Sequence, residues 1–83
     1  MKLVFHGKFS TIAGSSEMTV PCPSGITTLS DLRAWVTGVI PNLGDALKGR
    51  GVAVIVNMAI VHDATHPVTD ADEIAFLPPM SGG

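Results

Sequence analysis

The sequence lacks a second cysteine, a basic run and a long apolar stretch, and each absence argues against a class of protein. Cys22 is the one cysteine among 83 residues, which excludes an internal disulfide and an all-cysteine metal or iron–sulfur site within one chain. The net charge is −2, and no lysine–arginine cluster interleaved with aromatic residues indicates a nucleic-acid partner. The longest apolar run, residues 52–56, is far shorter than the roughly 20 residues that span a bilayer. We therefore expect a cytoplasmic protein that binds neither nucleic acid nor membrane.

The residues that are present suit one small domain with a distinct end. At 83 residues, 46% of them apolar, the chain is long enough for a single core. We expect this domain over residues 1–77, followed by an extended tail over residues 78–83. Apolar alternation predicts strands at residues 2–5 and 17–22, joined into a hairpin by a glycine-containing loop. Pro21 and Pro23 cannot donate backbone hydrogen bonds, so the second strand should lie at a sheet edge.

The centre of the sequence predicts one main helix, over residues 28–40. Thr28 and Asp31 have the spacing of a capping box, and Pro41 should end the helix. Its apolar positions repeat at intervals of three and four: Leu29, Leu32, Val36, Val39 and Ile40. Residues 42–51 have room for one further helical turn.

The second half of the chain predicts strands. Residues 52–57 read as a strand buried on both faces, a short strand can form near Ile60, and residues 73–77 form the last strand. In that last strand Ile74 and Phe76 share one face. The order ββαββ with one main helix across a mixed sheet is an α+β architecture.

Few side chains indicate catalysis or metal binding. His62 and His66 flank Asp63, but Pro67 places them in a loop, where the helical spacing of some zinc sites is not available. The acidic stretch at residues 69–73 lacks the glycine and the distal glutamate of a calcium loop. Cys22 has no basic neighbour in sequence that would stabilise a thiolate. We expect no bound metal or cofactor, and no self-sufficient active site.

The tail is the most specified segment. Pro78 and Pro79 fix their own φ and hold the preceding residues extended, so they should project the chain outward from the last strand. Met80, Ser81, Gly82 and Gly83 then extend up to about 13 Å, and the two glycines fit a narrow channel. They deliver the Gly83 α-carboxylate, which is unreactive at neutral pH until a partner activates it. The alternative is a tail that ends in glycine by chance.

These features together resemble a known family. The segments "VNMAIV" and "HPVTDADEIAFLPP" and the closing Gly82–Gly83 resemble the small sulfur-carrier subunits of molybdopterin synthase. Those subunits are ubiquitin-like proteins of the β-grasp fold. The resemblance runs over essentially the full length, although it is weak through residues 15–51.

The resemblance implies a mechanism in which partners supply the catalytic side chains. An E1-like enzyme would consume ATP to adenylate Gly83, and a sulfur donor protein would convert the acyl adenylate to a thiocarboxylate. The tail would then enter the large subunit of molybdopterin synthase and give its sulfur to a cyclic pyranopterin. The family arrangement is a heterotetramer of two small and two large subunits.

By position, the resemblance also implies partner-binding residues. They are His6, Ile60 and Leu77 on the sheet, followed by Pro78, Pro79, Met80 and Ser81 in the tail. His6 stands where an aromatic residue is common, and Ser10 and Thr11 replace a frequent basic–acidic pair. Two alternatives stay open: a carrier for thiamine, cysteine or tRNA thiolation, and a ubiquitin-like modifier that joins Gly83 to lysines.

Overall fold

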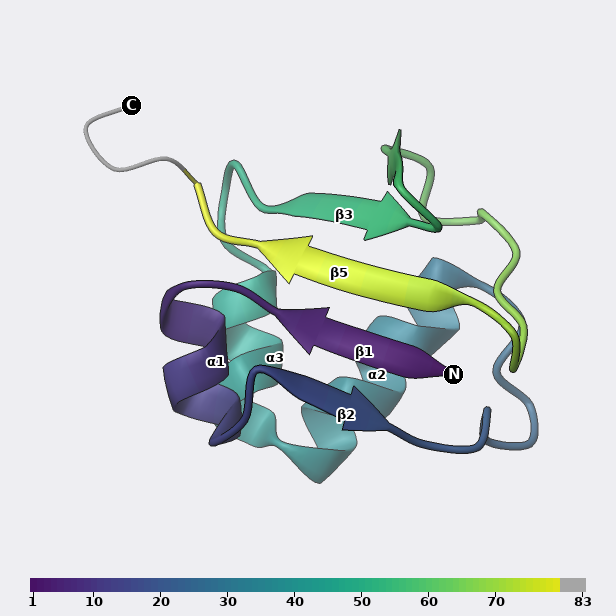
Figure 1. Cartoon of the computed structure of the whole chain (residues 1–83), viewed down its shortest axis with the longest axis horizontal. Coiled ribbons are helices and arrows are strands. Elements are labelled where there is room, and N and C mark those ends of the chain that lie inside the picture. Colours follow the sequence, from purple (N-terminus) through teal and green to yellow (C-terminus); the bar gives the residue numbers. More distant parts are fainter. Residues whose placement is uncertain (80–83) are drawn as a thin grey trace.

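The protein is built on one five-stranded mixed sheet with helices on one face, as the computed structural model of residues 1–79 shows (Figure 1). The strands are β1 (Lys2–Phe5), β2 (Glu17–Thr19), β3 (Ala53–Val56), β4 (Ala59–Val61) and β5 (Glu73–Leu77). The helices are α1 (Lys8–Ala13), α2 (Leu29–Val39) and α3 (Pro41–Leu47). The strand order is β2-β1-β5-β3-β4, with β1 and β5 parallel and the other neighbours antiparallel. The predicted α+β class and the short strand near Ile60 are confirmed.

The core lies between the sheet and the helices. Strand alternation sends every second side chain of β1, β3 and β5 toward the helices. The six strand residues on this covered face are at most 5% exposed: Leu3, Phe5, Val54, Val56, Ile74 and Phe76. The predicted pairing of Ile74 and Phe76 on one face is therefore confirmed.

Helix α2 begins where the sequence predicts. The Thr28 hydroxyl accepts the Asp31 N–H at 3.2 Å, and the Asp31 carboxylate accepts the Thr28 N–H at 3.2 Å, which completes the capping box. Leu29, Leu32 and Val36 are buried. Val39 is 52% exposed, so the predicted apolar face is wrong at that residue, whereas Ile40 is half-buried against the core.

Two helical segments differ from the prediction. The connection from β1 to β2 contains helix α1 rather than only a loop, and Gly14 ends it at φ 78°. Phe9 is fully buried and is its one buried residue, so this short helix leaves no periodic apolar pattern in the sequence. Pro41 both follows α2 and occupies the first turn of α3, which is longer than the single turn predicted.

The edge position of β2 is confirmed, but the strand is shorter than predicted. It ends at Thr19, and Pro21 and Pro23 lie beyond it in the connection to α2. A proline lacks the N–H that an internal ladder position requires, so pairing stops before them. The sheet therefore has short strands, β2 and β4, at its two edges.

Candidate functional site

The root of the tail is anchored by the central strand. Phe76 is fully buried, and its ring stacks on Phe5 with centroids 6.0 Å apart. The His6 N–H donates to the Phe76 carbonyl at 3.1 Å, extending the parallel pairing by one bond. Leu77 follows on the opposite face and is half-buried, and Pro78 then leaves the sheet. The last strand thus fixes where the tail begins.

Two glycines from other loops contact the prolines of this root. Gly7, at φ 55°, lies so close that a Cβ on it would be 3.0 Å from Pro78 Cγ. Gly51, at φ 78°, would place a Cβ 2.8 Å from Pro79 Cβ. We call Gly7 and Gly51 the glycine cradle. Side-chain bulk at either position would push against the proline it faces.

The face of the sheet opposite the helices is apolar along a cross-strand row. Ile60 pairs with Ile55, Ile55 with Ala75, and Ala75 with Val4. Ile60 is 62% exposed, and no helix of residues 1–79 covers this open face (Figure 1). Val4 and Ile55 are half-buried and Ala75 is buried, so most of the exposed surface of this row belongs to Ile60. Exposed apolar surface of this kind can bind a second protein.

The predicted partner-binding residues gather on this open face. Leu77 lies on β5 two residues after Ala75 and so on the same side, and exposed His6 continues β1 next to it. Ile60 joins them across Ile55. Met80, Ser81, Gly82 and Gly83 lie outside the described residues.

Sequence reasoning missed Ile55, because residues 52–57 were expected to be buried on both faces. That expectation is wrong: Val54 and Val56 are buried, but Ile55 is only half-buried. The strand pairing shows where Ile55 lies. Ile55 pairs with the exposed Ile60, so both side chains lie on the open face.

The acidic stretch before β5 is structural. Asp70 accepts the Cys22 N–H at 2.7 Å and the terminal ammonium of Met1 at 3.3 Å, and these two donors hold its pKa below its ordinary value. Asp72 accepts the Asn57 side-chain amide at 2.8 Å, the main cause of its own lowered pKa. These bonds tie the turn at residues 69–72 to the strands on both sides of β5.

The other candidate chemical groups are also engaged locally. Asp63 accepts the N–H and the hydroxyl of Thr65 at 2.8 and 2.7 Å, which lowers the pKa of Asp63. The half-buried Cys22 thiol points at the Ile26 carbonyl, 3.6 Å away. Within residues 1–79, no three His, Cys, Asp or Glu side chains are grouped closely enough to hold a metal ion. None of the helices in that span is long and apolar enough to cross a membrane.

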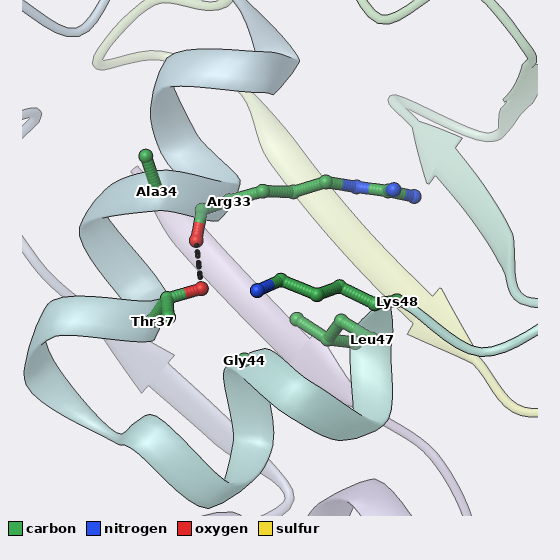
Figure 2. Close-up of a pocket in the computed structure, with 6 residues that line it drawn as sticks. All are labelled: Arg33, Ala34, Thr37, Gly44, Leu47 and Lys48. Carbon is green, nitrogen blue, oxygen red and sulfur yellow. Dashed lines mark hydrogen bonds between the residues drawn. The ribbon is translucent and has the colours of Figure 1, made fainter.

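A pocket of about 380 Å³ lies between α2 and α3, away from the predicted residues (Figure 2). Arg33 and Lys48 flank it, and the Thr37 hydroxyl donates to the Arg33 carbonyl at 2.8 Å. Gly44 has no space for a Cβ because Thr37 of the other helix contacts it directly. The pocket is a hollow beside a close helix crossing, where the Lys48 amine points toward Thr37 and the Arg33 guanidinium points away (Figure 2).

The sequence model of the ThiS family matches residues 3–83, which includes the tail and all of the sheet except Lys2. The chain belongs to the ThiS family. Two curated relatives are named "Molybdopterin synthase sulfur carrier subunit": the one from Escherichia coli K12 is 29% identical to this chain, and the one from Chlamydomonas reinhardtii is 30% identical. Both alignments span 83 residues, all of this chain and 99% and 98% of those proteins.

Solved structures give this ThiS-family chain its fold. The crystal structure of SAMP1 from Haloferax volcanii matches with a TM-score of 0.83 at 25% identity, over 100% of this chain and 98% of that one. The solution structure of small archaeal modifier protein 1 from Methanosarcina acetivorans matches with a TM-score of 0.80 at 23% identity, over 99% and 94%. The ubiquitin-like β-grasp fold predicted from the sequence is confirmed.

Proposed function

We propose that this ThiS-family chain is the sulfur-carrier subunit of molybdopterin synthase and that the Gly83 α-carboxylate is its reactive group. The observation that carries the proposal is the family match, which extends through Gly83. Two relatives are named for this role, and the residues before the tail form the central strand of the sheet. The tail contains no side chain that could activate its carboxylate, so the groups that catalyse activation belong to partner proteins.

The chemistry proceeds in two steps on the carboxylate. In the first, a carboxylate oxygen attacks the α-phosphorus of ATP on an E1-like enzyme, which forms the acyl adenylate and releases pyrophosphate. In the second, a donor that delivers sulfur at the oxidation level of sulfide attacks the carbonyl carbon. The new C–S bond replaces the C–O bond to AMP, and a thiocarboxylate remains.

In this proposal the open face binds the partner protein and the tail enters its active site. The row from Val4 to Ile60, with Leu77 and His6 beside it, offers an apolar surface that a partner can cover. The prolines and glycines beyond Leu77 reach into the partner's active site. In the active site of the large subunit the thiocarboxylate sulfur bonds to the cyclic pyranopterin. Water then cleaves the acyl C–S bond, so the sulfur stays on the pyranopterin and the Gly83 carboxylate returns.

Intact mass spectrometry tests this function directly. The protein is incubated with an E1-like adenylating enzyme, ATP and sulfide, beside a variant that lacks Gly83. We expect an oxygen-to-sulfur mass gain in the full chain and none in the variant. Absence of the gain under conditions that charge an authentic carrier would refute the proposal.

A second variant tests the narrow channel. Gly82→Val adds bulk only in the tail, so we expect an unchanged melting temperature and loss of sulfur transfer, with Gly82→Ala intermediate. Full activity of Gly82→Val would contradict the channel.

The modifier alternative shares the first step and differs in the second. The likeness to small archaeal modifier proteins favours it as the second candidate. A lysine amine, rather than sulfide, would attack the acyl adenylate or a derived thioester and form an isopeptide bond. Conjugates that depend on Gly83 and appear without added sulfide would favour this alternative.

A further inference from the structure

Three segments that are distant in sequence meet where the tail leaves the sheet. Because β1 and β5 are parallel, their carboxyl ends lie at the same end of the sheet (Figure 1). Gly7 follows β1 at that end. Because β3 is antiparallel to β5, it begins at that side, and Gly51 precedes it. The topology alone therefore places one glycine loop on each flank of Pro78 and Pro79.

The contacts in this cradle are closer than side chains allow. A Cβ at Gly51 would be 2.8 Å from Pro79 Cβ, and one at Gly7 would be 3.0 Å from Pro78 Cγ. Carbon atoms without a bond between them prefer about 3.5–4.0 Å, so a Cβ at Gly51 would force Pro79 or the loop to shift, and a Cβ at Gly7 would require the Pro78 ring to give way. Pro79 is exposed and Pro78 only half-buried, so these contacts bury little apolar surface.

Other glycines in the protein show that backbone shape alone does not explain the cradle. Gly14 and Gly25 also have positive φ, 78° and 88°, but a Cβ on either would meet no atom within 4 Å. Those two glycines serve their turns only. Gly51 has the same φ as Gly14 and in addition a proline against it.

We propose that Gly7 and Gly51 are positioning residues that fix the direction in which the tail leaves the domain. The two rigid prolines, held between two close backbones, transmit that direction to the residues beyond them. In the proposed function the tail enters a partner's active site while the open face binds the same partner. The angle between the tail and the sheet therefore determines how often the two contacts form together. This inference rests on the proposed function.

The decisive test compares Gly51→Ala with Gly14→Ala, because both glycines have a φ of 78° and only Gly51 has a proline against it. We expect both variants to lose thermal stability from the positive φ, with Gly51→Ala losing at least as much as Gly14→Ala because of the added contact with Pro79. With the carrier as the varied substrate of the E1-like enzyme, we expect Gly51→Ala to raise KM for adenylation about 10-fold, as when the productive tail direction is populated about one tenth of the time, with kcat within about twofold. We expect Gly14→Ala to leave KM within about twofold.

A double-mutant cycle identifies the contact that is responsible. Pro79→Gly removes the Cβ that an alanine at position 51 would strike. We expect the effect of Gly51→Ala on KM to shrink to under about threefold in the Pro79→Gly background. Equal KM values for Gly51→Ala and Gly14→Ala, or an undiminished effect without the proline Cβ, would overturn the proposal.

A measurement that needs no partner separates this inference from the proposed function. In the full-length protein, nuclear Overhauser cross-peaks should join Gly51 Hα to Pro79 Hβ and Gly7 Hα to Pro78 Hγ. Their absence would overturn the cradle even if the chain accepts sulfur. Their presence in a chain that no E1-like enzyme activates would instead refute the function and leave the geometry standing.

Discussion

The two faces of the sheet are built from the same strands and used in different ways. On the covered face, Phe5 and Phe76 stack on each other, and Phe76 is fully shielded by the helices. On the open face the apolar row ends at Ile60, which keeps 62% of its surface exposed. Burial within the chain stabilises the fold, whereas apolar surface left in water gains only when a second protein covers it. Apolar content alone therefore does not separate core from exposed surface, whereas position relative to the helices does.

The covered face should be broken most strongly by Phe76→Ala. Removing this fully buried ring leaves a cavity against Phe5, and we expect a loss of about 3–5 kcal/mol in the free energy of unfolding. Urea denaturation measures it, with Leu77→Ala as the neighbouring control on the other face. A larger loss for Leu77→Ala would reverse the assignment of the two faces.

The open face should respond in binding rather than stability. We expect Ile60→Ser to weaken binding to the large subunit by about 2 kcal/mol, measured by calorimetry. The free energy of unfolding should change by no more than about 0.5 kcal/mol, because the side chain is already mostly in water. Val39→Ser, which alters a 52% exposed residue outside the sheet, is the control. Equal weakening by both variants would show that the open face is not the docking surface.

The β3–β4 turn offers a smaller gain in stability. Asn57 and Met58 have φ values of 49° and 74°, and Met58 is 91% exposed, so its strained backbone is not offset by packing. We expect Met58→Gly to raise the free energy of unfolding by about 0.5–1 kcal/mol in urea denaturation. Asn57→Gly should lower it, because Asn57 bonds both Asp72 and the Glu73 N–H. A loss of stability in Met58→Gly would show that the methionine makes contacts worth more than the strain.

The smallest expected effect is acid sensitivity that belongs to neither face. Hydrogen bonds lower the pKa of Asp31, Asp70 and Asp72 below the ordinary value of 3.8, with Thr27 the main donor to Asp31. A lowered folded-state pKa means that the stabilisation is present above about pH 4 and is lost as the pH falls through the folded-state values. The melting temperature should fall modestly between about pH 5 and pH 2. In Asp31→Asn we expect a smaller fall over the same range. An equal fall in the melting temperature of Asp31→Asn would show that the Asp31 carboxylate does not contribute to the acid sensitivity.

Strong local signals explain what the sequence could predict. The capping box at Thr28 is as expected, and so is the burial of Ile74 and Phe76 on one face of β5, both of which depend on residues close in the chain. The expected alternation is incomplete, because Ala75 between them is buried as well. Helix α1 was missed because Phe9 is its one buried residue, and α3 was underestimated because Leu43 and Leu47 follow a proline that normally ends a helix. The half-burial of Ile55 depends on which strands flank it, and no local pattern contains that information.

The candidate site divides in the same way. The proline and glycine tail is visible in the sequence because its conformational limits are intrinsic to those residue types. The cradle was not predicted, because Gly7 and Gly51 are about 70 and 30 residues away from the prolines they face, and only the sheet order joins them.

The strand order also has a consequence for how the protein is made. The central strand β5 is the last strand to be synthesised, and until it emerges β1–β2 and β3–β4 are two separate two-stranded pieces. Isolated two-stranded pieces are marginally stable in water. A polypeptide interrupted before Glu73 should therefore stay unfolded and be open to degradation. Translation products that stop before Glu73 would then not accumulate as folded competitors for the partner proteins.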